Sequence, residues 1–85
     1  MARYRLLFKK SVAKDLRGIP KKDVKRVLKR IESLSDDPRP AGCEKLTDQE
    51  RYRLRQGVYR ILYEIQDDGP TVLVVKVAKR SEVYR

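Results

Sequence analysis

Histidine and tryptophan are absent from this 85-residue chain, and cysteine, methionine and phenylalanine each occur once. Without histidine, the chain lacks the side chain that most often exchanges protons near neutral pH. The single cysteine, Cys43, excludes an internal disulfide, which favours a reducing, cytoplasmic setting. No apolar run approaches the roughly 20 residues that span a bilayer, and the N-terminal apolar stretch is too short for a signal peptide.

Basic residues dominate what is present. The 22 lysines and arginines exceed the 12 acidic residues, which gives a formal charge of +10 and a pI near 10.1. Residues 1–35 hold 12 basic and 3 acidic side chains, residues 36–50 hold 2 and 5, and residues 51–85 hold 8 and 4. This balance predicts a polyanionic partner: nucleic acid, an anionic surface or an acidic protein. The length fits a single domain, residues 1–85.

The first half of the chain predicts one strand and two helices. Residues 3–8 alternate between polar and apolar side chains, as in a half-buried strand. Apolar residues recur at helical spacing before Gly18 and Pro20, and again through a longer amphipathic stretch that Pro20 opens and "DDPRP" ends. Residues 36–50 are predicted to be a polar loop, with Cys43 as a structural or incidental residue.

Three strands are predicted in the second half. Residues 52–56 and 59–66 alternate around a turn at Gly57, and residues 71–79 form a nearly continuous β-branched run after the turn "DDGP". The predicted fold is therefore α+β in the order β-α-α-β-β-β. A two-helix hairpin packs on one face of a small, mostly antiparallel sheet, and a short C-terminal helix is possible.

The alternation sorts the strand residues into two faces. One face is predicted to pack on the helices; its residues are Tyr52, Leu54, Tyr59, Ile61, Tyr63 and Ile65. The uncovered face is predicted to carry Arg53, Arg55 and Arg60. Val72 and Val74 are also predicted on the uncovered face, as an apolar patch for a protein partner.

Clustered arginines on a strand face have two interpretations. They can serve solubility alone. Like charges on neighbouring positions of one face repel, however, and only Glu64 is predicted nearby as an acid on that face. The planar guanidinium fork also matches phosphate oxygens better than lysine does. A phosphodiester-binding site is therefore the favoured interpretation.

The stretch "YRLRQGVYRILYEI" followed by "VVKVAKRSEVYR" resembles the RelE/ParE superfamily of toxin–antitoxin toxins, most closely its RelE branch. The resemblance covers nearly the whole chain, including Lys45 and Leu46. It implies a basic active site on the concave face of the sheet. It also implies a metal-independent endoribonuclease, with no cofactor, that cleaves mRNA in the ribosomal A site through attack of the 2′-hydroxyl on the adjacent phosphorus.

The resemblance also assigns site residues. Arg53, Arg55 and Arg60 match the basic strand positions, Arg80 matches an arginine near the end of the last strand, and Tyr84 matches a tyrosine that stacks on a codon base. Lys79 and Lys45 are predicted to contact RNA. The implied partners are mRNA, ribosomal RNA at the A site and a cognate antitoxin with an acidic or amphipathic segment. The toxin–antitoxin complex is expected to bind operator DNA through the antitoxin.

The proton-transfer groups stay open. Arginine does not readily act as a base, because its reference pKa lies above about 12. Tyr84 is one candidate base, Glu64 is another unless it pairs with Arg60, and a mechanism without a strong base is a third option. Arg80 or Lys79 would donate a proton to the leaving oxygen.

Two other functions compete with the nuclease. A ParE-like toxin would bind and inhibit DNA gyrase without cutting nucleic acid, and it generally lacks this set of arginines and tyrosine. An RNA-binding module without catalysis is the third option. The two basic helices are either a solvated amphipathic face or a surface for ribosomal RNA phosphates.

Overall fold

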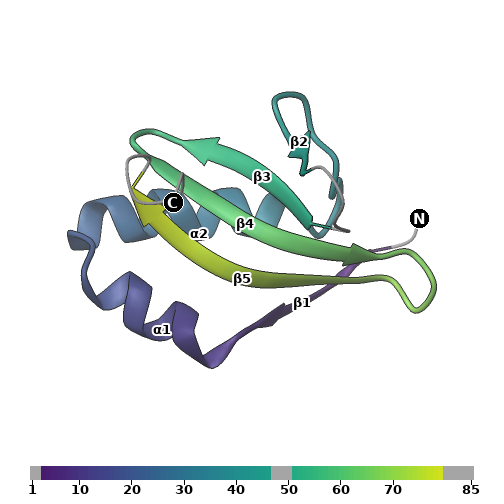
Figure 1. Cartoon of the computed structure of the whole chain (residues 1–85), viewed down its shortest axis with the longest axis horizontal. Coiled ribbons are helices and arrows are strands. Elements are labelled where there is room, and N and C mark those ends of the chain that lie inside the picture. Colours follow the sequence, from purple (N-terminus) through teal and green to yellow (C-terminus); the bar gives the residue numbers. More distant parts are fainter. Residues whose placement is uncertain (1–2, 47–50, 80–85) are drawn as a thin grey trace.

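A computed structural model gives the fold and describes residues 3–46 and 51–79 (Figure 1). Its elements are β1 (Arg5–Phe8), α1 (Lys10–Arg17), α2 (Lys21–Ser33), β2 (Glu44–Lys45), β3 (Arg51–Gln56), β4 (Tyr59–Gln66) and β5 (Thr71–Lys79). Arg80, Tyr84 and the segment considered for a C-terminal helix lie outside the described residues.

The strands form one five-stranded sheet in the order β1-β5-β4-β3-β2. β1 runs parallel to β5, and the other pairs are antiparallel. Both helices follow β1 in the chain, before the remaining strands, and pack on one face of the sheet (Figure 1). The predicted α+β architecture is confirmed, and so are the bounds of β4 and β5.

Local sequence explains where the helices begin and end. Pro20 precedes α2 with a backbone φ of −54°, a value that suits the start of a helix. Gly18 ends α1 after one face of the helix has buried Val12. Helix α2 ends at Ser33, before the aspartates and prolines predicted to stop it, and Leu34 then inserts into the core.

The core lies between the sheet and the helices. It is formed by apolar and tyrosine side chains: Val12, Val27, Ile31, Leu34, Tyr52, Leu54, Tyr59, Ile61, Tyr63, Ile65, Val72, Val74 and Val77. The prediction that Val72 and Val74 face away from the helices is wrong, because both are fully buried in this core. An apolar run such as β5 has no alternation from which its faces can be assigned.

Residues 36–46 are more ordered than the predicted polar loop. They include β2, which pairs with β3 through Glu44 opposite Arg53. The segment is also anchored to the core, because the buried Tyr63 hydroxyl donates a hydrogen bond of 2.8 Å to the Pro38 carbonyl. Cys43 packs against the core as well. This segment therefore holds β2 against the rest of the sheet.

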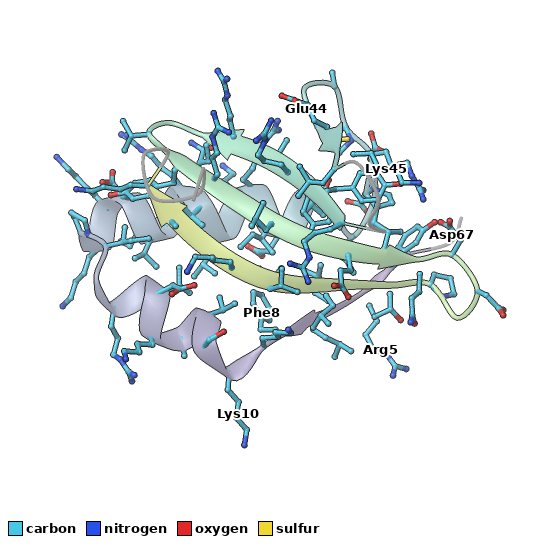
Figure 2. The ribbon with its side chains drawn as sticks, viewed as in Figure 1. Arg5, Phe8, Lys10, Glu44, Lys45 and Asp67 are labelled. Atoms are coloured by element: carbon cyan, nitrogen blue, oxygen red, sulfur yellow. The ribbon has the colours of Figure 1, made fainter. Side chains whose placement is uncertain are left out.

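Arg39 and Asp67 connect two loops at this end of the molecule. Arg39 donates two hydrogen bonds, of 3.2 and 3.0 Å, to Asp67 in the β4–β5 turn, and Tyr4 donates a third of 2.7 Å. The Arg39 hydrogen bonds, followed by that from Tyr4, lower the pKa of the Asp67 carboxyl below its usual range. The segment after α2 is thereby joined to the β4–β5 turn, where Figure 2 labels Asp67.

Candidate functional site

Three of the predicted site arginines share the face of the sheet that points away from the helices. Arg53 and Arg55 project from β3, and Arg60 projects from β4. The register sets Arg55 directly opposite Arg60, and it sets Arg53 opposite Leu62 on the same face. The structure therefore brings these three residues together, as the alternation predicted.

The three arginines differ in their contact with solvent. Arg55 is exposed, whereas the side chain of Arg53 is 18% exposed and Arg60 is only 1% exposed. Val75 and Ala78 are also buried without belonging to the core cluster. The face predicted to be uncovered is thus only partly open to solvent, and Arg55 is the most accessible of the three arginines.

Carboxylates flank the cluster on two sides. Glu64 forms an ion pair of 3.0 Å with Arg51, whereas the sequence suggested Arg60 as its partner. Glu44 on β2 forms a second pair, of 2.9 Å, with Arg53 (Figure 2). Sequence analysis missed Glu44 because it lies in the segment predicted to be a loop. Both acids reduce the repulsion among the arginines and leave Arg55 facing solvent.

A cation on β5 completes the face. The β4–β5 register is irregular: Tyr63 pairs with Val74, but Leu62 pairs with Lys76, so Val75 is an extra residue in β5. This bulge reverses the alternation of β5 and turns Lys76 to the arginine face. The Lys76 side chain is 48% exposed. Nothing in the sequence of β5 marks the bulge, which is why this lysine was missed.

The remaining predicted residues are placed elsewhere. Lys79 pairs with Tyr59, and Lys45 pairs with Tyr52, so the register puts both lysines on the helix side of the sheet. The structure does not gather them with the arginines. Arg80 and Tyr84 fall outside the described residues.

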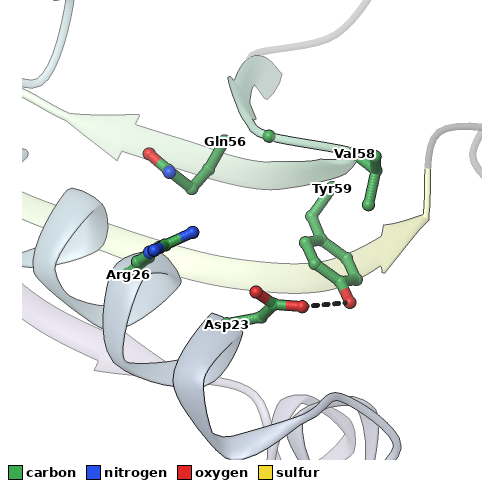
Figure 3. Close-up of a pocket in the computed structure, with 6 residues that line it drawn as sticks. Asp23, Arg26, Gln56, Val58 and Tyr59 are labelled. Carbon is green, nitrogen blue, oxygen red and sulfur yellow. Dashed lines mark hydrogen bonds between the residues drawn. The ribbon is translucent and has the colours of Figure 1, made fainter.

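A polar pocket of about 250 Å³ lies on the helix side, where α2 meets the β3–β4 turn (Figure 3). Its lining comes from Asp23, Arg26, Gln56, Gly57, Val58 and Tyr59. The Tyr59 hydroxyl donates a hydrogen bond of 3.1 Å to Asp23. Burial, followed by this hydrogen bond, raises the pKa of Tyr59, so the phenol keeps its proton at neutral pH. The pocket therefore lies on the other side of the sheet from the arginine face.

Two further properties of the described residues bear on the type of site. Among residues 3–46 and 51–79, no three histidine, cysteine or acidic side chains lie together as metal ligands would. Neither helix within that part of the chain has the length and apolar character needed to cross a bilayer.

The chemical capacity of the face follows from its groups. Guanidiniums on adjacent strands present several hydrogen-bond donors with fixed positive charge, a combination that suits phosphate oxygens. The rigid sheet holds the backbone of Arg55 and Arg60 in register, so the donors need little reorganisation. Such a surface can bind a phosphodiester and stabilise extra negative charge that develops on it.

Known proteins with similar sequences are described as toxins. A family model described as the ParE toxin of the type II toxin–antitoxin system parDE matches residues 6–84. The chain is 30% identical over 80 residues to a putative toxin RelE1 of Methanocaldococcus jannaschii, with 89% of each chain covered.

Solved structures of relatives share the fold. The RelE–RelB complex from Pyrococcus horikoshii superposes with a TM-score of 0.82 and 29% identity, covering 94% of this chain and 97% of that one. The isolated RelE toxin of E. coli gives a TM-score of 0.77 and 28% identity, covering 95% and 90%. This chain is a member of the RelE/ParE superfamily of type II toxin–antitoxin toxins and belongs to its RelE-like branch.

Proposed function

We propose that this toxin is a ribosome-dependent endoribonuclease that cleaves mRNA in the A site. A 2′-hydroxyl of the mRNA would attack the adjacent phosphorus without a metal, leaving a 2′,3′-cyclic phosphate and a 5′-hydroxyl. The observation that carries the proposal is the register that sets Arg55 opposite Arg60, beside Arg53, on the sheet face away from the helices. The site of action would be the cytoplasm, where mRNA and ribosomes meet.

The arginines have separate tasks in this proposal. Attack on phosphorus adds negative charge to the phosphate oxygens, and positioned donors that meet this charge contribute about 2.7–4 kcal/mol each. Arg55 is exposed and can reach the scissile phosphate directly. Arg60, which is 1% exposed, supplies fixed positive charge from beneath. Arg80 keeps the role considered for it from the resemblance, donation of a proton to the leaving 5′-oxygen, and Tyr84 stacks on a codon base.

A test on programmed ribosomes separates the nuclease from its alternatives. The purified protein should cut mRNA in the A site, as mapped by primer extension, and should leave DNA gyrase supercoiling unchanged. Inhibition of gyrase without RNA cleavage would establish the ParE-like alternative. RNA binding without cleavage would establish the non-catalytic module.

Arg55→Met is the sharper variant for this test because Arg55 is exposed and its loss leaves the core intact. It should slow cleavage about a hundredfold, the scale for losing one such donor. Arg5→Met removes another exposed cation, from the edge strand β1, and serves as the control (Figure 2). Equal rates for the two variants would refute the assigned site. Arg60→Ala and Arg80→Ala are expected to abolish growth arrest.

The proposed partner is a cognate antitoxin. Structures of relatives include RelE–RelB and RelBE toxin–antitoxin complexes. In this chain, an apolar groove of about 390 Å³ lies between the end of β1 and the two helices. Its lining consists of Phe8, Lys9, Lys10, Val12, Ala13, Leu16 and Leu28. Phe8 is 45% exposed there, although it is a large apolar side chain.

Charge determines which occupant suits this groove. The first 35 residues carry a net charge of +9, from 12 basic and 3 acidic side chains, and Lys9 and Lys10 stand at the groove (Figure 2). A second copy of the chain would bring the same positive charge. An amphipathic antitoxin segment with apolar residues on one side and acidic residues on the other fits both features. In the proposed complex, operator DNA is bound through the antitoxin.

The groove has a matched control. Phe8→Ser should weaken binding of the antitoxin encoded beside this gene, whereas Val58→Ser should not, although Val58 is 62% exposed at the β3–β4 turn. Isothermal titration of each variant measures the difference. Equal affinities would place the antitoxin on another surface.

A further inference from the structure

We propose that a cationic furrow on α2 binds the phosphate backbone of a double-helical RNA segment, separate from the strand that is cut. The furrow is lined by one stripe of α2, namely Arg26, Lys29, Arg30 and Ser33, together with Gln56 at the end of β3. It has a volume of about 330 Å³ and shares Arg26 and Gln56 with the polar pocket in Figure 3. This inference goes beyond the proposed nuclease site and does not depend on cleavage.

Three neighbouring cations on one side of the helix are the first observation. Arg26 stands three positions before Lys29 and four before Arg30, so the three side chains are neighbours on the helix surface. Like charges at this spacing destabilise a helix. None of the three forms an ion pair with another described residue. Asp23, in the adjoining pocket, instead accepts the hydrogen bond of Tyr59. An external anion would therefore relieve the repulsion.

The lining of the furrow favours a nucleic acid backbone over a peptide. Every residue that lines it is charged or polar, so an amphipathic segment would find no apolar surface there for its apolar side. The groove beside Phe8, which we assign to the antitoxin, offers such a surface. Phosphates need positive charge and hydrogen-bond donors, and the guanidinium, ammonium and amide groups of the furrow supply both.

The type of RNA follows from the side chains that are present. The lining of the furrow within the described residues contains no aromatic ring. Proteins that hold single strands stack unpaired bases on aromatic rings, whereas paired RNA is recognised through its backbone and its shape. A row of backbone contacts without a ring for stacking therefore suits a double-helical segment.

Strand β3 separates the furrow from the arginine face. Gln56 lies opposite the core residue Tyr59, so its side chain is on the helix side of the sheet. Arg55 precedes it and lies opposite Arg60, on the other face. A strand bound at Arg55 would therefore leave the furrow free for a second RNA segment. In the setting of the proposed function, ribosomal RNA would supply that segment, and contact at both surfaces would strengthen binding to the ribosome.

Fluorescence anisotropy with two RNAs tests the proposal. One probe is a hairpin and the other is a single strand, and both carry 2′-O-methyl groups so that neither is cut. Arg26→Met combined with Arg30→Met should weaken hairpin binding about tenfold in dilute salt, the scale of two exposed charge contacts. The slope of log affinity against log salt concentration should fall by about two. Single-strand binding should change by less than about twofold, because distant sites act independently.

Lys21→Met combined with Lys25→Met is the matched control. Both lysines are exposed on α2, stand four positions apart as Arg26 and Arg30 do, and line neither the furrow nor the adjoining pocket. The control removes the same charge and should leave hairpin binding nearly unchanged. In urea, the furrow variant should be at least as stable as the unaltered protein, because it removes an unfavourable pair of like charges.

The outcomes separate this surface from the proposed nuclease site. Equal weakening of hairpin binding by the two double variants would show an effect of net charge and overturn the furrow. Unchanged hairpin binding, equal weakening of both RNAs or a loss of stability in the furrow variant would overturn it as well. If the furrow variant loses an acidic peptide and keeps the hairpin, the occupant is an acidic protein. If the unaltered protein cuts no mRNA while the furrow variant loses the hairpin selectively, the nuclease function falls and the furrow stands.

Discussion

The ion pair between Glu44 and Arg53 predicts that one acidic side chain restrains RNA binding. Glu44 lies 2.9 Å from the Arg53 guanidinium, and its side chain is 58% exposed. A phosphate bound at Arg53 would stand roughly 5 Å from this carboxylate, where repulsion in a water-like medium is about 0.8 kcal/mol. Glu44→Gln removes this repulsion and should tighten RNA binding roughly fourfold.

Fluorescence anisotropy with a 2′-O-methyl RNA, which cannot be cleaved by this mechanism, measures the affinity alone. The gain should be largest in dilute salt and should shrink toward 1 M salt, where the screening length falls to about 3 Å. Folding stability should change by less than about 1 kcal/mol, because Glu44 is largely exposed and ion pairs with an exposed partner contribute little.

Glu32→Gln is the matched control for this experiment. It makes the same change in net charge on the exposed surface of α2, on the helix side of the sheet. If Glu32→Gln tightens binding as much as Glu44→Gln, net charge explains the effect and the local pair does not. If Glu44→Gln fails to tighten binding in dilute salt, phosphate does not bind beside Arg53, and the position of the site is wrong.

Two further predictions concern the segment that carries β2. Tyr63→Phe should lower the unfolding free energy, measured in urea, by about 1–3 kcal/mol, because the Pro38 carbonyl loses its buried donor. Tyr59→Phe should lower it less, because the Tyr59 hydroxyl lies beside an open pocket. A larger loss for Tyr59→Phe would contradict this. Asp67→Asn should lower stability at neutral pH, because Arg39 binds the ionised carboxylate and lowers its pKa. This difference should vanish as acid protonates Asp67 in the folded protein; a difference that persists there would refute the pKa assignment.

The buried face of an element was predicted correctly wherever polar and apolar residues alternate regularly. In β3 and β4 the pattern separates core from arginine face residue by residue, so the positions of Arg53, Arg55 and Arg60 follow from the sequence alone. The amphipathic stripe of α2 likewise identifies Val27 and Ile31 as buried. In both cases one side of the element is apolar and the other is polar, so only one orientation buries the apolar side.

Prediction failed where that contrast is missing. β5 is apolar on both faces, so its sequence fits either orientation, and the bulge at Val75 changes the orientation halfway along. This explains both the wrong placement of Val72 and Val74 and the omission of Lys76. The two-residue strand β2 is too short to show any period, which concealed the partnership of Glu44 with Arg53.

The arrangement of charge links ligand binding to folding. Arg55 and Arg60 are cross-strand neighbours with like charge, a pairing that destabilises the sheet, while Glu44 and Glu64 neutralise other arginines at its flanks. A polyanion bound to this face would relieve the repulsion only in the folded chain. Its binding would therefore stabilise the fold by RT ln(1 + [L]/Kd), or about 2.7 kcal/mol at a hundredfold excess over Kd. An acidic partner in the β1 groove would stabilise the fold by the same linkage from the opposite side of the sheet, without contacting the arginines.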